Sequence, residues 1–397
     1  MVKLKDVASF VRGITFKPED VIPVDSVGAV ACMRTKNVQE QIDLSDVWGI
    51  PRSFVKRSDQ FVREGDLLVS TANSWNLVGK CSWVPVLPWP TTVGGFIAAL
   101  RGGDRIDPRY LYHWFASSDV QVRVRNCARQ TTNIANLSFD RCLDLILSLP
   151  PLPEQKRVAA ILDQADDLRR MRKRALRSLN KLPAITFRDM FGDLVANDSD
   201  FEEGTVADLI AGFDTGKNLA PDPDNEDATN RVLKVSAVTS GYFRASEAKP
   251  LPDSYAPPLA HFIKRGDLLF SRANTEALIG ATALVDEAVS NLVLPDKIWR
   301  FKWRGEPEPT FVHHLFQSQP FRREISRRAS GTSGSMKNIG KDKVLSILIG
   351  LPPKVKRWEF ARQVEEYANA GRNARTASAI ADALFTSLQH RAFRGDL

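Results

Sequence analysis

Side chains that could bind a polyanion gather in three short segments of the first half of the sequence, and each segment has a counterpart in the second half. They are arginines, lysines, amides and hydroxyls, which can donate hydrogen bonds to phosphates and to base edges. In the first half they are Arg34, Lys36, Asn37, Thr71, Asn73, Ser74, Asn76, Arg129, Gln130 and Thr131. Together with Lys217, the second half contributes Lys234, Ser236, Thr239, Arg272, Asn274, Thr275, Thr332, Ser333, Ser335, Lys337 and Asn338. We interpret these positions as DNA-binding candidates.

The same residue types also build ordinary turns, where Asn, Ser, Thr and Gly are favoured for conformational reasons. Any single segment could therefore be a turn with no ligand. The recurrence of all three segments at matching places in both halves favours nucleic-acid binding over turns alone.

Motifs for catalysis and cofactor binding are absent from the sequence. There is no G-x-G-x-x-G loop, H-E-x-x-H pair or G-x-S-x-G elbow, and no Asp/Asn-Pro-Pro-aromatic tetrapeptide of the kind that amino-methyltransferases use. Residues 212–218 resemble a phosphate loop but are one residue short of it, and no histidine lies at zinc spacing from a cysteine. We expect a non-catalytic chain that binds no cofactor or metal, although catalytic residues without a local motif would escape this reading.

The chain contains an internal repeat. Residues 61–73 (FVREGDLLVSTAN) return as residues 262–274 (FIKRGDLLFSRAN), and the Leu-Pro-Pro of residues 149–151 returns at residues 351–353. The repeat predicts two half-units, each with a globular domain followed by a long helix.

The two long helices are expected within residues 151–193 and 351–397. A heptad pattern predicts a coiled-coil seam in the first from Val158, Ala165, Arg172, Leu179, Ile161, Leu168, Ala175 and Leu182. The second seam reads Phe360, Val364, Tyr367, Gly371, Ala374, Ser378, Ala381, Phe385, Leu388 and Ala392. We expect Pro183 to kink or end the first helix and Gly192 to stop the chain's helical run. The alternative is two ordinary amphipathic helices in one core.

A helix over residues 154–182 would be roughly 43 Å long at about 1.5 Å per residue, against about 34–36 Å for one turn of B-DNA. A helix of that length would place two DNA-binding domains about one turn of B-DNA apart. The basic cluster at residues 169–174, with Arg177, is either the solvated face of the coiled coil or a contact for phosphates or a partner subunit.

The expected fold class is α+β with an α/β-like character. Strands are predicted at residues 66–70, 84–86, 97–100 and 267–271, helices at 108–117 and 309–317, and a polar loop at 213–230.

Composition fits an intracellular protein with a polyanionic partner. The formal net charge is +8 and the four cysteines show no C-x-x-C spacing, so they read as reduced thiols. There is no apolar run of membrane-spanning length and no signal-peptide pattern at the N-terminus. We therefore expect a cytoplasmic location.

Several stretches together resemble the specificity (S) subunit of type I restriction–modification enzymes. They are LPPLPEQKRVAAILDQADDLRR and FRDMFGD in the centre, ALFTSLQHRAFRGDL at the end, and RVLKVSAVTSGYF, FIKRGDLLFSRANTEALIGATALV and LPDKIWR in the second half. The first half carries weaker versions, MRTKNV and FVREGDLLVSTANSWNLVGKCSWV. Residues 351–357 depart from the pattern because they lack the Pro-Glu-Gln of the central segment.

The resemblance implies target-recognition domains at residues 1–150 and 194–350, joined by two antiparallel coiled-coil helices at 151–193 and 351–397. Each domain would read one half of a bipartite, asymmetric site in double-stranded DNA, and the helical spacer would fix the gap and dock two modification subunits. S-adenosylmethionine, ATP and Mg²⁺ would belong to these subunits and to two restriction subunits. The rival readings are a coiled-coil scaffold without DNA specificity and a self-contained DNA methyltransferase or nuclease.

Overall fold

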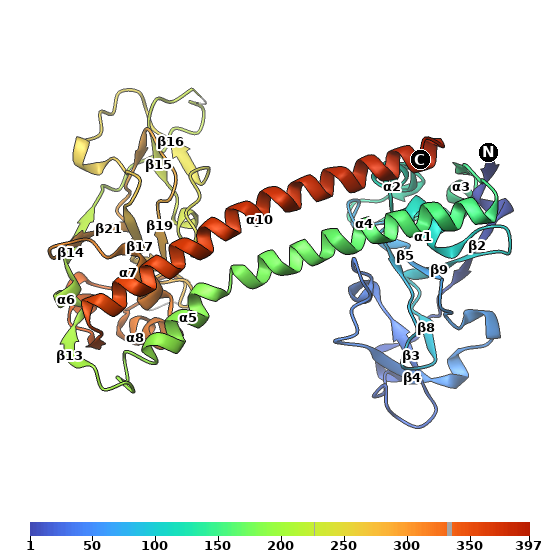
Figure 1. The fold of residues 1–397 in the computed structure, drawn as a ribbon, viewed down its shortest axis with the longest axis horizontal. Helices are drawn as coiled ribbons and strands as arrows, with labels where there is room; N and C mark the ends of the chain where they lie inside the picture. Colours follow the sequence, from blue (N-terminus) through green and yellow to red (C-terminus); the bar gives the residue numbers. More distant parts are fainter. Residues whose placement is uncertain (226, 332–335) are drawn as a thin grey trace. The chain divides into compact units, whose positions relative to one another are not determined.

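Two units make up the chain, and both follow the same succession of strands and helices (Figure 1). A computed structural model describes residues 1–225, 227–331 and 336–397. Unit 1 comprises residues 1–174 and 376–397, and unit 2 comprises residues 175–375. Both passages of the chain from one unit to the other fall inside a helix, α4 (Leu152–Leu179) or α10 (Lys354–Arg394). The proposed division into four segments, with the long helices apart from the domains, stays a prediction.

Unit 1 is built around an antiparallel four-stranded sheet and a mixed three-stranded sheet. The first has the order β2 (Ala8–Arg12), β9 (Ile97–Gly102), β5 (Leu67–Ser70), β7 (Cys81–Trp83). The second has the order β4 (Trp48–Pro51), β3 (Ala29–Met33), β8 (Thr91–Val93), with β3 and β8 parallel. Small elements complete it: β1 (Val2–Lys3) with β12 (Ile146–Leu147), β6 (Ala72–Asn73), β10 (Ala128–Gln130), β11 (Ala135–Leu137), α1 (Pro108–Ala116), α2 (Ser118–Asn126) and α3 (Phe139–Leu143).

Unit 2 repeats this topology. Its four-stranded sheet has the order β14 (Ile210–Thr215), β21 (Ile298–Trp303), β17 (Leu268–Ser271), β19 (Thr282–Leu284). Its three-stranded sheet has the order β16 (Ala248–Pro250), β15 (Arg231–Leu233), β20 (Leu292–Val293), again with one parallel pair. The remaining elements are β13 (Glu202–Thr205) with β23 (Leu348–Leu351), β18 (Ala273–Asn274) with β22 (Lys337–Asn338), α5 (Leu182–Phe191), α6 (Val206–Leu209), α7 (Pro309–Gln317), α8 (Gln319–Arg328) and α9 (Lys341–Leu345). The matching sheet orders confirm the internal repeat and the α+β class.

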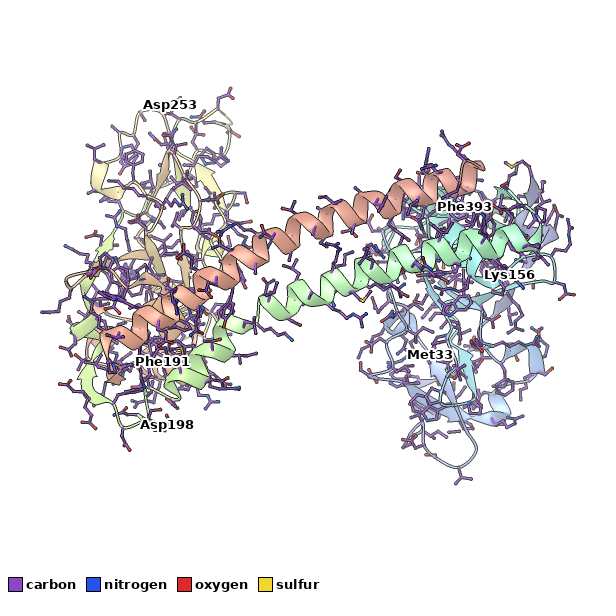
Figure 2. The ribbon with its side chains drawn as sticks, viewed as in Figure 1. Met33, Lys156, Phe191, Asp198, Asp253 and Phe393 are labelled. Atoms are coloured by element: carbon purple, nitrogen blue, oxygen red, sulfur yellow. The ribbon has the colours of Figure 1, made fainter. Side chains whose placement is uncertain are left out.

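Each unit completes its hydrophobic core with parts of the long helices. In unit 1, Val158 and Leu162 of α4 and Phe385 of α10 join the cluster around α1. In unit 2, Phe191 of α5 (Figure 2) packs against Phe360 of α10, with ring centroids 5.6 Å apart. An aromatic core of this kind explains why these helices fold with the sheets instead of standing alone.

The two helical segments run antiparallel within each unit. In unit 1, Arg157 bonds the Leu397 carbonyl oxygen at 2.7 Å, and Lys173, farther along α4, pairs with the earlier Asp382 at 3.3 Å. In unit 2, the hydroxyls of Thr186 and Tyr367 lie 3.2 Å apart. Farther along α5, Phe191 contacts Phe360, which precedes Tyr367 on α10. The antiparallel arrangement expected from the resemblance is therefore confirmed inside both units.

Proline and glycine set the ends of the central helices. Helix α4 ends at Leu179, and α5 begins at Leu182 with Pro183 in its first turn, where the missing N–H costs little. Gly192 follows α5 with φ +64°, a backbone conformation that favours glycine. Both expectations for these residues are confirmed.

The predicted seam of the central helix is partly wrong. The buried residues of α4 are Gln155, Val158, Ala159, Leu162 and Asp166, whereas Leu168 of the predicted seam is 43% exposed. The helix keeps the period of a straight α-helix, because it packs on a domain surface as well as on a second helix. On α10 all ten seam positions are buried or half-buried, so the second stripe is confirmed.

Most of the short predicted strands and helices are confirmed, whereas one strand and the start of one loop are wrong. Strands at 66–70, 97–100 and 267–271 and helices at 108–117 and 309–317 are confirmed within a residue or two. The strand at 84–86 is wrong: β7 ends at Trp83, since Pro85 has no N–H for a ladder. The loop at 213–230 is wrong at its start, where residues 213–215 belong to β14 and the Phe213 ring is buried; residue 226 of that loop lies outside the described residues.

Within the described residues, no helix is both long and apolar enough to span a membrane. The four cysteines are free thiols. Burial raises the pKa of Cys32 to about 12, which makes its thiol unreactive at neutral pH.

Candidate nucleic-acid interface

A small sheet in unit 1 brings two of the three predicted segments together. Strand β11 pairs with β10 on one side and with β6 on the other, so Asn136 lies opposite both Arg129 and Ala72. Arg129, Gln130 and Thr131 are exposed, as are Ser74 and Asn76 after β6. Segments 70–76 and 129–133 therefore form one polar edge.

The third predicted segment, residues 34–37, meets this edge at a tight turn. The turn is formed by residues 94–96, between β8 and β9. The N–H of Gly94 donates to the carbonyl oxygen of Met33 at 2.9 Å, at the end of β3. On the other side, the N–H of Thr71 donates to the carbonyl oxygen of Phe96 at 2.8 Å. The end of β3 and segment 70–76 thus both bond this turn, and segment 129–133 joins them through β11.

The side chains of the third segment differ in what they offer a partner. Arg34 lies over the Trp48 ring, 3.6 Å from its centroid, and pairs with Asp46 at 3.0 Å. Lys36 also pairs with Asp46, at 2.6 Å. Hydrogen bonds from Lys36 and then Arg34 lower the pKa of the Asp46 carboxyl. These two cations remain partly exposed and could exchange Asp46 for a phosphate.

Asn37 and Thr71 do not fit a direct contact. Asn37 is fully buried; its Oδ1 accepts from the Arg34 N–H at 2.8 Å and its Nδ2 donates to the carbonyl oxygens of Asp43 and Asp46. The expectation that Asn37 binds DNA is corrected, since its amide holds the loop together. Thr71 is 9% exposed, and its backbone is bonded on both sides.

Unit 2 repeats the edge with different side chains. Strand β18 pairs with β22, which places Asn274 opposite Lys337 and Ala273 opposite Asn338. Asn274 Nδ2 donates to the Ser271 hydroxyl at 3.4 Å and its Oδ1 accepts from the Thr275 N–H at 2.8 Å. Asn73 makes the same pair of bonds with Ser70 and Ser74 in unit 1, at 3.2 and 2.8 Å. The two asparagines shape a turn that the repeat has kept.

Arginine replaces threonine at the centre of the unit 2 edge. Arg272 stands in the place of Thr71, and its Nε donates to the Asp296 carbonyl oxygen at 2.8 Å while its guanidinium lies over Trp299. Its side chain is 32% exposed. A guanidinium fixed in this way can still offer its outer N–H groups to guanine or phosphate.

The other predicted residues of unit 2 lie around this arginine or farther off. Lys217 is exposed, and its backbone bridges to Pro295, beside Asp296. Ser236 donates to Glu247 at 2.6 Å, Lys234 pairs with the same carboxylate at 3.6 Å, and Thr239 donates to the Ser236 carbonyl oxygen at 3.4 Å. Thr332, Ser333 and Ser335 lie outside the described residues.

Sequence reasoning missed several residues at these edges. Phe96 and Trp48 in unit 1 and Asp296 and Lys297 in unit 2 come from the turns and strands that flank the predicted segments. Phe96 and Lys297 each stand directly before a buried isoleucine that begins a strand of the repeat. Comparison of the two halves at that position was the signal that could have found them.

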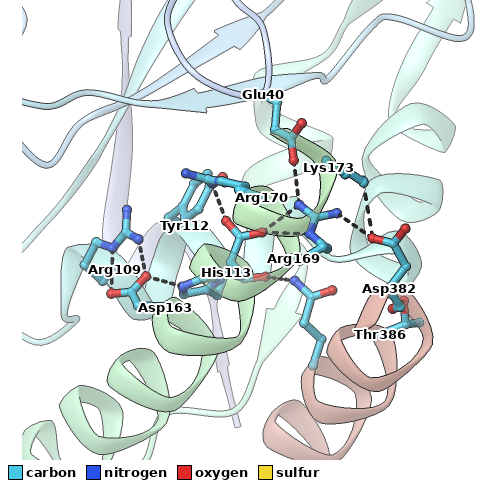
Figure 3. A network of polar contacts seen from close by, with 12 residues as sticks. Glu40, Arg109, Tyr112, His113, Asp163, Arg169, Arg170, Lys173, Asp382 and Thr386 are labelled. Atoms are coloured by element: carbon cyan, nitrogen blue, oxygen red, sulfur yellow. Dashed lines mark hydrogen bonds and ion pairs between the residues drawn. The ribbon is translucent and has the colours of Figure 1, made fainter. Parts of the chain in front are cut away.

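The basic cluster of α4 is used inside unit 1 (Figure 3). Arg169 bonds Asp166 and Glu40, at 2.6 and 2.7 Å, and Arg170 pairs with the same Asp166. Lys173 pairs with Asp382 of α10. The reading as a solvated helix face is wrong for Arg169 and Arg170, because both are largely buried in ion pairs that join α4, α10 and the loop of Glu40.

Among the described residues, no group of three or more His, Cys, Asp or Glu side chains is placed to hold a metal ion. The arrangement that both units share is a polar, cationic sheet edge suited to binding a nucleic acid.

Two comparisons with other sequences identify relatives. Residues 1–180 match a family described as the type I restriction modification DNA specificity domain. The chain is 26% identical to the type I restriction enzyme EcoKI specificity subunit of Escherichia coli K12, over 98% of this chain and 87% of that one. It is 21% identical to the MjaVIII specificity subunit of Methanocaldococcus jannaschii, over 93% and 86% of the two chains.

Solved structures share the fold. The S subunit of a type I restriction–modification system from M. genitalium superposes with a TM-score of 0.54 at 12% identity, covering 99% of this chain and 95% of that one. A chain from a structure of a type I R-M system superposes with a TM-score of 0.57 at 16% identity, covering both chains fully. The likeness shows that this chain shares the overall fold of those two chains. Residues 1–180 thus match the family's domain, and nearly the whole chain is similar to type I restriction–modification specificity subunits.

Proposed function

We propose that this chain is the DNA-sequence-recognition subunit of a type I restriction–modification complex. In this proposal, unit 1 and unit 2 each read one half of a bipartite, asymmetric site in double-stranded DNA. The observation that carries it is the repeated edge: Asn73 and Asn274 make the same turn beside exposed cations in both units. Base edges and phosphates are the ligands that such side chains recognise.

The two edges differ enough to read different bases. Unit 1 has the buried Thr71 and the exposed Phe96 at the positions where unit 2 has Arg272 and Lys297. An arginine discriminates guanine strongly, whereas a buried threonine cannot. The half-sites should therefore differ, which makes the whole site asymmetric.

Catalysis is assigned to partner subunits in this proposal. Two modification subunits would carry S-adenosylmethionine and methylate adenine N6, and two restriction subunits would use ATP and Mg²⁺. The missing methyltransferase tetrapeptide in the sequence agrees with that division of labour. Exposed apolar side chains on both helices of unit 1 support docking of a partner: Leu168 and Met171 on α4 and Ile380 and Leu384 on α10 are 43%, 53%, 64% and 52% exposed. We call these four side chains the exposed apolar strip.

The helices are proposed to fix the gap between the half-sites. The chain passes between the units inside α4 and inside α10, so a change in helix length there alters the connection directly.

The decisive experiment is to co-express the chain with the modification subunit encoded beside it, in a host without DNA methylation, and to map N6-methyladenine across the genome. A split motif with defined bases on each side of a fixed gap is the expected result. A soluble complex that leaves no methylation and binds no duplex selectively would favour the scaffold reading. Methyl transfer by the purified chain with S-adenosylmethionine alone would favour the methyltransferase reading.

A further inference from the structure

Phe96 is the most exposed aromatic side chain at the unit 1 edge. It is 66% exposed and stands at the end of the tight turn of residues 94–96. The turn is fixed on both sides, because Ile97 N–H donates to the Gly94 carbonyl oxygen and the Phe96 carbonyl oxygen accepts from Thr71. A single exposed apolar ring is common on proteins, so the inference depends on what lies beside it.

A cavity of about 460 Å³ opens next to Phe96. Its walls include Phe16, Trp48 and Arg34, together with the turn itself. The rings of Phe16 and Trp48 meet edge to face with centroids 6.3 Å apart. We call this space the aromatic cavity. It is bounded by flat apolar surfaces and lies against the proposed DNA-binding edge.

Arg34 lines the aromatic cavity with its guanidinium held in place. Arg34 uses Nη2 to bond Asp46. Its Nε is buried, and the residues that the structure describes offer it no acceptor. What Arg34 contributes to the cavity wall is therefore a guanidinium stacked on the Trp48 ring, 3.6 Å from its centroid. The ligand complementary to these flat faces is planar and aromatic.

A nucleobase has that chemistry. Bases inside a duplex have their faces covered by neighbours, so one base can enter a pocket only after it leaves the stack. Exposed phenylalanines of DNA-binding proteins open base steps by inserting between them. We propose that Phe96 acts as a wedge in the duplex and that the aromatic cavity receives the base it displaces. This proposal rests on the proposed function.

Unit 2 provides an internal contrast. Its turn at residues 295–297 takes the same place: Lys217 bridges to Pro295 as Ile14 bridges to Gly94, and the Lys297 carbonyl oxygen accepts from Arg272 as that of Phe96 does from Thr71. In unit 2, Lys297 occupies the position that corresponds to Phe96. Its charged side chain is suited to binding phosphate and not to insertion between bases. Displacement of a base is thus confined to the half-site that unit 1 reads.

The experiment uses the complex of this chain with its modification subunits and duplexes that carry the mapped site. 2-Aminopurine replaces one base at a time across both half-sites and their flanks, because its fluorescence rises when it leaves the stack. Permanganate oxidation of unstacked thymines gives a second readout that does not depend on quenching by Trp48. We expect a severalfold signal at one position other than the methylated adenines, lost in Phe96→Ala and kept in Lys297→Ala.

A second variant tests the cavity itself. A Cβ at Gly95 would lie 3.5 Å from the Thr15 hydroxyl oxygen and 3.6 Å from the Ile14 carbonyl oxygen, which are ordinary contacts. Gly95→Leu should therefore fold and fill the cavity mouth, abolishing the signal, while Gly95→Ala keeps it. Thermal unfolding of each variant is the control, and if Gly95→Leu is unstable the exposed Phe96→Ala variant decides.

Three results would overturn the wedge. They are a signal confined to the methylated adenines, a signal that Phe96→Ala leaves intact, and no signal at all in a complex that still binds its site selectively. In each of these the proposed recognition function stands. Loss of selective binding by the unaltered complex would remove both proposals together.

Discussion

The imidazole Nε2 of His113 lies 2.7 Å from the carboxylate of Asp163 and donates to it, which joins α1 to α4 inside unit 1. His113 is fully buried. Arg109, one turn earlier on α1, donates to the same carboxylate through Nε at 3.0 Å. One acidic side chain of α4 thus accepts hydrogen bonds from two side chains of α1 (Figure 3).

This tie predicts a stability that depends on pH. Burial by itself raises the pKa of the Asp163 carboxyl, but hydrogen bonds from His113 and Arg109 outweigh it and lower the pKa to about 2. The ionised form therefore stabilises the fold above the unfolded-state pKa of about 3.9, and this stability is lost as pH falls towards the folded-state value. Asp163→Asn should lower the free energy of unfolding by about 2 kcal/mol at pH 7, with the difference from wild type shrinking as pH approaches the folded-state pKa. Urea unfolding at several pH values measures it, with the exposed Asp167→Asn as control; an equal loss at every pH would contradict the assignment.

The network around Asp166 predicts a structural role for Arg169. Arg169→Ala removes ion pairs to Asp166 and Glu40 and the contact with the Phe385 ring. It should destabilise the chain by about 2–3 kcal/mol, since a nearly buried carboxylate loses one of its two cations. The matched change Arg174→Ala, at an exposed position of the same helix, should stay within about 0.5 kcal/mol. Weaker DNA binding by Arg169→Ala with unchanged unfolding would instead restore the phosphate reading.

Arg272 is expected to specify one half-site. Arg272→Ala should weaken binding by about 1–3 kcal/mol and relax the sequence required on one side of the gap. Arg265→Ala is the control, because Arg265 is exposed and precedes β17 whereas Arg272 follows it. Methylation mapping and gel filtration separate the outcomes: loss of subunit assembly along with recognition would mean that Arg272 is structural.

The helices are expected to set the gap. Four residues inserted before Ala175, with four more after Arg375, add about one turn, or about 6 Å, to each helix where the chain changes units. The methylated motif should then carry a longer gap between unchanged half-sites. A gap of unchanged length in an active complex would show that other contacts determine it.

The exposed apolar strip of unit 1 is expected to dock a modification subunit. Ile380→Glu places a charge on the strip and should reduce the modification subunit that co-purifies with the chain, because burying that charge is costly. Ser387→Glu, exposed farther along α10, is the control. Equal co-purification of both variants would place the docking surface elsewhere.

The sequence by itself determined the duplicated architecture. Residues 61–73 and 262–274 predicted equivalent strands, and Pro183 and Gly192 marked where the central helices end. These features depend on local backbone chemistry and on direct likeness between segments, so the linear order of residues contains them.

The tertiary structure decided which side chains face what. Asn37 was predicted to contact DNA, but its side chain is buried. Leu168 was predicted to lie in the coiled-coil seam, but its side chain is exposed. Arg169 was read as solvated, but it pairs with Asp166 of its own helix and with Glu40 of a distant loop. Phe96, Trp48 and Arg34 were far apart in sequence, and only packing brought them around one cavity. The physical reason is that burial and partner choice arise from contacts between distant segments, and no local pattern encodes those contacts.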